Sequence, residues 1–240
     1  MATPRPGAAA GGAGGARRSA PVRRLAEESG AGVLPRDPGP ACEARHFPPP
    51  GRGGCAGRQR RGGVIYGDRI RLRHVEREDL PRFVEWLNDP EVRRGLAMYL
   101  PLSMVEEADW FENTLKREPD ERPLAIEVGG AEGWALVGNC GFFNIEWRVR
   151  SAELGIFIGD KGYWNKGYGT EAMRLLLRHG FTTLNLNRIY LRVFADNPRA
   201  IRAYEKAGFI EEGRMRQAEY HDGHYLDVLL MSVLKSEWKE

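Results

Sequence analysis

Cysteine is scarce in this chain, and its spacing argues against a metal or redox site. The 240 residues contain three cysteines, Cys42, Cys55 and Cys140, and no pair has the Cys-x-x-Cys spacing. Structural zinc sites and dithiol redox motifs usually need such closely spaced cysteines, so we expect neither, and no structural disulfide. Cys140 falls in a predicted strand and is interpreted as a small core residue.

Two common catalytic signatures are also missing. No Gly-x-Ser-x-Gly sequence marks a hydrolase nucleophile, and no Gly-Lys-Ser/Thr ends a phosphate loop, because Lys166 precedes Gly167. Nucleotide hydrolysis is therefore disfavoured. Of the five histidines, His221 and His224 flank a predicted hairpin turn, where polar residues are expected in any case, so we expect no metal.

Long apolar runs are absent from the sequence. None approaches the ~18 residues that a membrane-spanning helix needs, and none resembles the apolar region of a signal peptide. We therefore expect a cytoplasmic protein with no membrane partner.

The first 63 residues have no lysine and few residues that form a core. They hold 14 Gly, 9 Pro, 12 Ala and 11 Arg, which together fill 46 of the 63 positions. Such a segment buries too little apolar surface to offset the conformational entropy of the chain. We expect a disordered tail over residues 1–63 and one folded domain over residues 64–240.

The charge of the chain divides at the same boundary. The tail has 11 Arg and 4 acidic residues, a net +7, whereas the rest has 25 Lys and Arg against 29 Asp and Glu, a net −4. A basic arm for RNA, a transit peptide and a GC-rich leader read as protein each fit part of this composition.

We favour the leader, because Ala, Gly, Pro and Arg have GC-rich codons. Translation would then start near Val64, which the intact mass of the native protein would test, and the folded domain is not expected to bind nucleic acid.

Hydrophobic periodicity in the rest of the chain predicts an α/β (α+β) fold. Ser103 and Glu106 form a capping-box pattern, Pro90 is expected to stop the first helix, and hairpin turns are expected at Gly129-Gly130 and Asp222-Gly223. The predicted elements are strands over residues 69–73, 124–128, 134–145, 153–158, 188–195, 210–220 and 225–234, and helices beginning near Leu80, Ser103, Thr170 and Asn197. They would make one domain with a mixed sheet of about seven strands flanked by about four helices.

The most informative motif is a glycine-containing loop between a predicted strand and a predicted helix. Residues 163–172 read Tyr-Trp-Asn-Lys-Gly-Tyr-Gly-Thr-Glu-Ala. With little side chain at Gly167 and Gly169, peptide N–H groups from about Asn165 to Thr170 can converge on a phosphate at the helix N-terminus. The helix dipole favours negative charge there. An ordinary tight turn would carry the same glycines, so this motif does not decide the function alone.

A second helix begins 28 residues beyond Gly169, at Asn197. Asn197 is a good N-cap, Pro198 suits the first helical position, and Gly208 suits the C-terminal cap. Tyr204 lies within this helix, between Asn197 and Gly208. The helix follows a predicted strand in which apolar residues alternate. The glycine loop and the Asn197 helix therefore each begin directly after a strand.

These two segments together resemble the GNAT superfamily of acyl-CoA-dependent N-acetyltransferases. The pyrophosphate loop of that family has Arg or Gln, two variable residues, Gly, one variable residue, and Gly or Ala; here it reads Trp-Asn-Lys-Gly-Tyr-Gly from Trp164. With tryptophan at the first position, the loop resembles that of the RimJ/RimL-like branch. Members of this branch acetylate ribosomal-protein N-termini and other amines. The resemblance runs over roughly residues 64–238. It implies a GNAT-like sheet that is splayed where the fourth and fifth strands part, with acetyl-CoA in the gap.

The resemblance also implies which residues bind the cofactor. Main-chain groups of the strand before the loop would bind the pantetheine, and one N–H would polarise the acetyl carbonyl. The Asn197 side chain would hold the pantetheine or acetyl end. The full set is Ile156, Phe157, Ile158, Gly159, Trp164, Asn165, Lys166, Gly167, Tyr168, Gly169, Thr170, Asn197 and Tyr204.

Tyr204 and Glu153 are the candidate catalytic residues. The resemblance places the Tyr204 phenol beside the CoA sulfur, where it would stabilise and protonate the departing thiolate. Glu153 lies 14 residues before Gly167, where several family members have a catalytic carboxylate. An unperturbed Glu, with a pKa near ~4.3, is a poor base for an amine with a pKa near ~10.4, so Glu153 would need burial, a water relay or a purely electrostatic role. A packed core tyrosine and an exposed strand charge are the structural alternatives.

The acceptor is less well defined than the cofactor. The acceptor pocket is expected to form from the span 88–112 together with the last hairpin, and this span contains Asp89, Glu91, Glu106, Glu107, Asp109 and Glu112. These acids would attract a cationic amine, although solvated helix faces explain them more simply. We predict direct transfer of acetyl from acetyl-CoA, without a metal, to a primary amine: a peptide or protein N-terminus, or a small polyamine.

Other functions remain open on the sequence alone. One is a polyamine or aminoglycoside acetyltransferase, and another is a non-catalytic module that binds CoA or associates with RNA. A homodimer is compatible with the sequence, which does not fix the oligomeric state.

Overall fold

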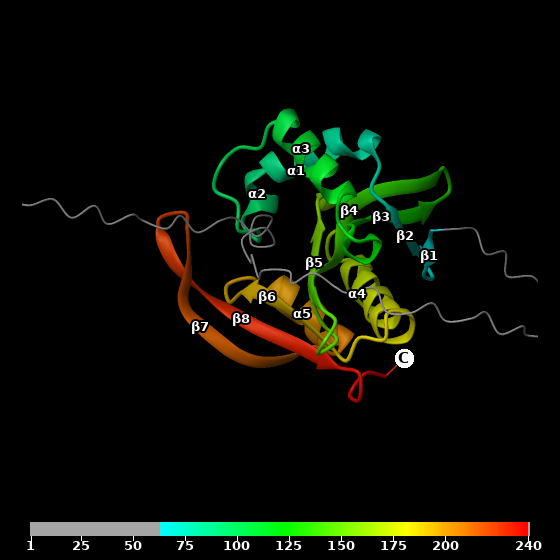
Figure 1. The fold of residues 1–240 in the computed structure, drawn as a ribbon. Coiled ribbons are helices and arrows are strands. Elements are labelled where there is room, and N and C mark those ends of the chain that lie inside the picture. The colour runs from blue at the N-terminus through cyan, green and yellow to red at the C-terminus, as the bar shows by residue number, and fades with distance from the viewer. Residues whose placement is uncertain (1–62, 240) are drawn as a thin grey trace, which may run out of the picture.

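A mixed eight-stranded sheet organises residues 63–239, which are the residues that the computed structural model describes. The strand order is β1-β2-β3-β4-β5-β6-β8-β7, and all neighbours are antiparallel except the parallel pair β5 and β6. Apart from Gly63, the tail expected to be disordered lies outside the described residues. The predicted α/β class with a mixed sheet is confirmed (Figure 1).

The strands and helices follow the predicted order with two additions. The strands are β1 (Ile65–Tyr66), β2 (Ile70–His74), β3 (Leu124–Gly130), β4 (Gly133–Glu146), β5 (Ser151–Ile158), β6 (Arg188–Phe194), β7 (Ile210–His221) and β8 (His224–Leu234). The α-helices within the described part are α1 (Leu80–Asn88), α2 (Pro90–Arg93), α3 (Met104–Leu115), α4 (Tyr168–Arg178) and α5 (Pro198–Ala207). The additions are β1 and α2, which are too short to show a periodic pattern.

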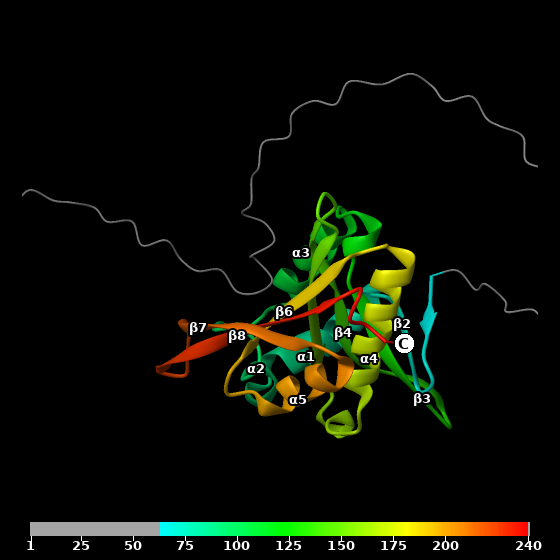
Figure 2. The ribbon, with the colours of Figure 1, turned by 90° about the horizontal axis from the view of Figure 1, so that it is seen from below.

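Both faces of the sheet are covered, and the alternation of side chains along β3 shows how. Ile126 and Val128 belong to the main hydrophobic cluster, which includes the buried residues of α4 such as Met173 and Leu176. Ala125 points to the opposite face, into a second cluster with Phe83 of α1 and Phe111 of α3. Because successive strand residues face opposite sides, α4 packs on one face of the sheet and α1 and α3 on the other (Figures 1 and 2).

Local sequence signals set several element ends. The capping box at α3 is confirmed: the Ser103 hydroxyl accepts from the Glu106 N–H at 3.2 Å, and the Glu106 carboxylate accepts from the Ser103 N–H at 2.9 Å. Pro90 does not simply stop a helix, because it also opens α2 with Asp89 as the N-cap. A proline lacks an N–H that the first helical turn would leave unpaired, so it suits both positions.

The two hairpin turns had different outcomes. Asp222 and Gly223 both have positive φ, 48° and 87°, which confirms the predicted turn between β7 and β8. The other turn lies between Gly130 and Gly133 rather than at Gly129-Gly130. Gly129 is still inside β3, where a Cβ atom would lie 3.3 Å from the Trp134 ring, so that glycine makes room for a side chain.

Cys140 is buried in the main cluster, as expected, and burial raises the pKa of its thiol. No helix within residues 63–239 is long and apolar enough to cross a membrane.

Candidate active site

The sheet opens between β5 and β6, which are the fourth and fifth of the predicted strands, as the resemblance implied. The two strands are paired only at Ser151–Arg188, Ala152–Ile189 and Glu153–Tyr190. Beyond Glu153, β5 continues to Ile158 with β4 as its strand partner. The main-chain groups of residues 154–158 that point away from β4 therefore face the gap, where they can bind a ligand.

The glycine loop follows β5 and leads into α4. Asn165 and Gly167 both have left-handed backbone conformations, with φ of 59° and 85°, and Gly167 is the N-cap of α4. The first intrahelical bond runs from the Glu171 N–H to the Gly167 oxygen, at 3.0 Å. The N–H groups of residues 168–170 therefore precede the first hydrogen bond of the helical ladder, as at the start of any α-helix.

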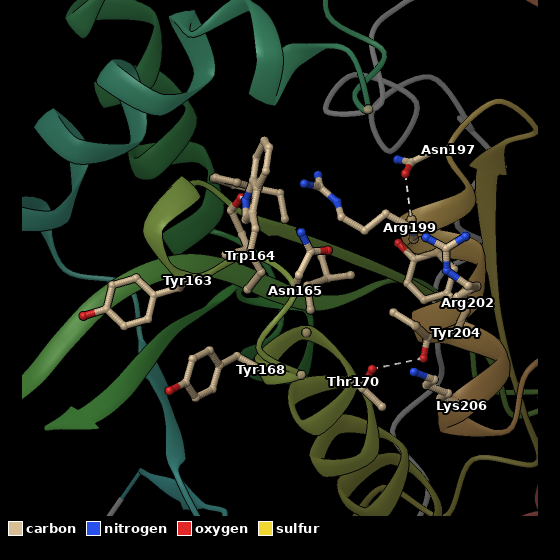
Figure 3. Close-up of a pocket in the computed structure, with 18 of the residues that line it drawn as sticks. Tyr163, Trp164, Asn165, Tyr168, Thr170, Asn197, Arg199, Arg202, Tyr204 and Lys206 are labelled. Carbon is tan, nitrogen blue, oxygen red and sulfur yellow. Dashed lines mark hydrogen bonds between the residues drawn. The ribbon is translucent and has the colours of Figure 1, made fainter.

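This loop, the end of β5 and the start of α5 surround a cavity of about 260 Å³ (Figure 3). Eleven of the thirteen predicted cofactor residues line it, namely Ile156, Phe157, Ile158, Trp164, Asn165, Gly167, Tyr168, Gly169, Thr170, Asn197 and Tyr204. Gly159 does not line it, and its N–H donates to the Val137 oxygen at 2.8 Å instead. The Ile158 oxygen accepts from the Trp164 indole N–H at 2.7 Å, which fixes the loop to the end of β5.

Lys166 is the other predicted residue outside the lining. Its ammonium lies 5.5 Å from the centre of the Tyr163 ring. Its carbonyl oxygen accepts a hydrogen bond from Arg69, at 3.1 Å.

Three basic residues of α5 line the cavity and were missed in the sequence. They are Arg199, Arg202 and Lys206. The Arg199 guanidinium lies 3.6 Å from the centre of the Trp164 ring and so connects α5 to the glycine loop (Figure 3). Arg199, Arg202 and Lys206 follow one another at intervals of three and four residues, which places them on one helix face, and this spacing was the signal that the sequence offered.

A second cavity, of about 360 Å³, lies beside the first. Gly95, Leu96, Ile156, Phe157, Asn197 and Tyr204 line both cavities. The rest of the second lining is largely apolar, with Trp110, Phe142, Phe143, Phe194 and Met215 among its members. Its charged members are Arg117, Glu121, Glu153, Arg192 and Glu219.

Tyr204 is partly buried and stands where the two cavities meet. Desolvation raises the pKa of its phenol to about 12, and the nearby charge of Arg199 opposes this shift. The hydroxyl is therefore protonated at neutral pH and is available as a hydrogen-bond donor.

Glu153 is a buried carboxylate with partners on both oxygens. Oε1 lies 2.7 Å from Nε of Arg192, and Oε2 accepts from Asn144 at 3.1 Å. Glu153 also raises the pKa of Tyr190, second to the effect of desolvation. The alternative of an exposed strand charge is excluded, because the Glu153 side chain is only 5% exposed.

The acidic residues of the span 88–112 line neither cavity. Asp89 caps α2 and lies 2.7 Å from the ammonium of Lys161, which also pairs with Glu91, and Glu106 caps α3. These acids therefore do not line the pocket, and attraction of a cationic amine by their charge stays a prediction. The span contributes apolar residues to the second cavity instead, such as Met98 and Trp110.

Residues 69–210 match the family model described as the acetyltransferase (GNAT) domain. The chain belongs to the GNAT family. It is 33% identical over 172 residues to a spermidine N(1)-acetyltransferase of Vibrio cholerae, covering 70% of this chain and 95% of that protein. It is 29% identical over 177 residues to YdaF of Bacillus subtilis, named as a candidate ribosomal N-acetyltransferase, covering 72% and 94%.

A solved structure agrees with these sequence relatives. The crystal structure of spermidine N-acetyltransferase from Vibrio cholerae in complex with CoA and spermine superposes with a TM-score of 0.64 at 30% identity, over 70% of this chain and 97% of that one. This GNAT protein is accordingly an acetyl-CoA-dependent N-acetyltransferase that acts on an amine. No group of three or more His, Cys, Asp or Glu side chains within residues 63–239 is placed to hold a metal ion.

Proposed function

We propose that this GNAT enzyme acetylates a small aliphatic polyamine by direct attack in a ternary complex. The observation that carries the proposal is the meeting of two cavities at Tyr204 and Asn197. Acetyl-CoA would enter from the first cavity, with its diphosphate at the N-terminus of α4. The amine would enter from the second.

The lining of the second cavity supports an aliphatic cation as acceptor. Its aromatic and methionine side chains suit methylene groups, and the charge of Glu153 is balanced by Arg192. The other charged residues of the lining are Glu121, Glu219 and Arg117, which leaves an excess of one carboxylate. The relatives named as spermidine N-acetyltransferases support the same substrate class.

The reaction in this geometry needs no covalent enzyme intermediate. The amine nitrogen attacks the acetyl carbonyl carbon, a C–N bond forms, the C–S bond breaks, and the proton lost by the amine ends on the CoA sulfur. A main-chain N–H of β5 would polarise the carbonyl, because residues 156–158 line the gap. Tyr204 would donate its hydrogen bond to the sulfur as negative charge develops there.

The raised pKa of Tyr204 makes this phenol a weak proton donor to the CoA thiolate. A thiol has a pKa near ~8.5, so complete proton transfer from a phenol with a pKa of about 12 to a thiolate is uphill. The ammonium formed on the attacking nitrogen is the stronger acid and would supply the proton. We therefore propose that Tyr204 stabilises the thiolate by a hydrogen bond and relays that proton.

A panel of amines tests the proposed substrate class. Thiol release is measured with acetyl-CoA in excess. The kcat/KM for spermidine and for spermine should be at least about tenfold higher than that for a peptide with a free N-terminus or for an aminoglycoside. A faster reaction with the peptide would replace the polyamine by an N-terminal acceptor. Binding of CoA by calorimetry, without thiol release from any amine, would contradict catalysis and favour the non-catalytic module.

Glu153 is proposed to act electrostatically rather than as the general base. A proton taken from the amine would neutralise this carboxylate and so remove the charge that pairs with Arg192. Glu153→Gln should therefore lower kcat by no more than about tenfold, whereas loss of a general base costs about 100-fold or more. The rise of kcat/KM between pH 7 and 9, which follows the neutral fraction of an amine with a pKa near ~10.4, should be the same in both proteins.

A larger loss of kcat in Glu153→Gln, together with a changed pH profile, would identify Glu153 as the base. Thermal unfolding of the variant provides the control, because removing one partner of a buried pair also destabilises the fold. The homodimer and the cytoplasmic location expected from the sequence stay predictions.

A further inference from the structure

Arg69, which directly precedes β2, makes a set of contacts with the glycine loop and α4 that the proposed chemistry does not use. Its guanidinium donates from Nη1 to the Lys166 oxygen at 3.1 Å and from Nε to Glu171 Oε2 at 2.9 Å. Its backbone N–H donates to Glu171 Oε1 at 2.8 Å. The guanidinium carbon also lies 4.7 Å from the centre of the Tyr168 ring.

The turn that carries Arg69 is fitted closely against α4. Gly67 donates to the Ile70 oxygen at 2.9 Å, which closes the turn. A Cβ atom at Gly67 would lie 2.9 Å from Leu175 and 3.0 Å from Glu171 Oε1. The position of Arg69 is therefore set by packing as well as by charge.

The bond to the Lys166 oxygen sets the direction of the next amide. The peptide between Lys166 and Gly167 is trans and planar, so its C=O and N–H point in opposite directions. Arg69 holds the Lys166 oxygen and so also fixes the direction of the Gly167 N–H, at a residue that lines the cavity. Asn165 and Gly167, on either side of Lys166, both have left-handed backbone conformations, and the Arg69 hydrogen bond holds the main chain of the residue between them.

Arg69 also compensates a charge that opposes anion binding. Glu171 lies in the first turn of α4, where its carboxylate would repel a diphosphate at the same helix end. The Glu171 side chain is 16% exposed, and Arg69 contacts both of its oxygens. A paired Glu171 can stabilise the helix without competing with the ligand.

We infer that Arg69 is a positioning residue for the cofactor diphosphate, acting through the Lys166–Gly167 peptide and through neutralisation of Glu171. The inference rests on the proposed placement of the diphosphate at the start of α4. Arg69 itself need not touch the cofactor. The binding of ligands that lack the diphosphate should therefore not depend on Arg69.

The test compares acetyl-CoA with acetylated pantetheine, which has the same thioester but no diphosphate or adenosine. Arg69→Met removes both effects, whereas Arg69→Lys keeps the charge but loses the planar fork that reaches two acceptors. Arg77→Met is the matched control, because Arg77 is also an exposed arginine, paired with Glu112 and placed over Phe111, outside both cavities. Calorimetry with CoA measures affinity without any acceptor.

We expect Arg69→Met to lower kcat/KM for acetyl-CoA about tenfold, mostly through KM, and to weaken CoA binding by a similar factor. The value for acetylated pantetheine should change by less than about twofold, and Arg69→Lys should fall between wild type and Arg69→Met. An equal loss with both thioesters, or unchanged CoA affinity in a folded variant, would overturn the inference. If no amine is acetylated, the proposed acceptor fails, but the CoA affinities still decide the role of Arg69.

Discussion

Replacing Tyr204 with Phe should lower kcat about 100-fold, while the KM for acetyl-CoA changes by less than about threefold. The substitution removes one hydroxyl, which we propose donates to the CoA sulfur only as the C–S bond breaks. An interaction formed mainly in the transition state affects kcat and not ground-state binding. Initial rates of thiol release at varied acetyl-CoA and saturating amine measure both constants.

The hydroxyl of Tyr66 offers a comparison for this variant. Tyr66 is an exposed residue of β1, outside both cavities, so Tyr66→Phe should leave kcat unchanged. A normal kcat in Tyr204→Phe would show that the phenol is only a packed side chain. A large rise in the KM for acetyl-CoA would show instead that the hydroxyl binds the ground state.

The pH dependence of the wild-type enzyme gives a second check on Tyr204. Its pKa is raised to about 12, so the folded protein holds this proton more tightly than the unfolded chain. The hydrogen-bond donor is thus present at all pH values below about 11, and ionisation of Tyr204 should not limit kcat at pH 9.

Replacing Gly138 with Ala should destabilise the domain by about 3 kcal/mol or more, the largest stability effect that we expect from one added methyl group. A Cβ atom at Gly138 would overlap the Phe157 oxygen and lie 3.0 Å from the Ile158 Cα atom. Both are backbone atoms of β5, so no side-chain rotation relieves the clash. Denaturant unfolding monitored by tryptophan fluorescence measures the change.

The same clash should reach the active site. Phe157 and Ile158 line the cofactor cavity, and a shift of β5 away from β4 would move the edge that faces the gap. Gly213→Ala is the control, since Gly213 is also a strand glycine but has no atom within 4 Å of an added Cβ. That variant should be neutral or slightly stabilising. Equal stability of the two variants would contradict the packing described for Gly138.

Much of the site was predictable because its signals are local. The loop glycines, the N-cap at Asn197 and the strand before the loop are defined by backbone conformation and capping within a few residues. The basic face of α5 carried the same kind of signal in its spacing. The roles of the acids near α2 and α3 could not be predicted, because composition alone does not tell whether a carboxylate caps a helix, pairs with a lysine or faces a pocket.

The sequence by itself determined the class of fold, the order of its main strands and helices and the loop suited to an anion, because periodicity, capping and glycine conformations act between near neighbours. Only the tertiary structure decided that Arg69 meets Glu171, 102 residues away, and that Glu153 pairs with Arg192. It also decided that two cavities meet at Tyr204. These contacts depend on the order in which the strands pair and on where β5 and β6 part, and residues distant in the chain come together only when the whole sheet has formed.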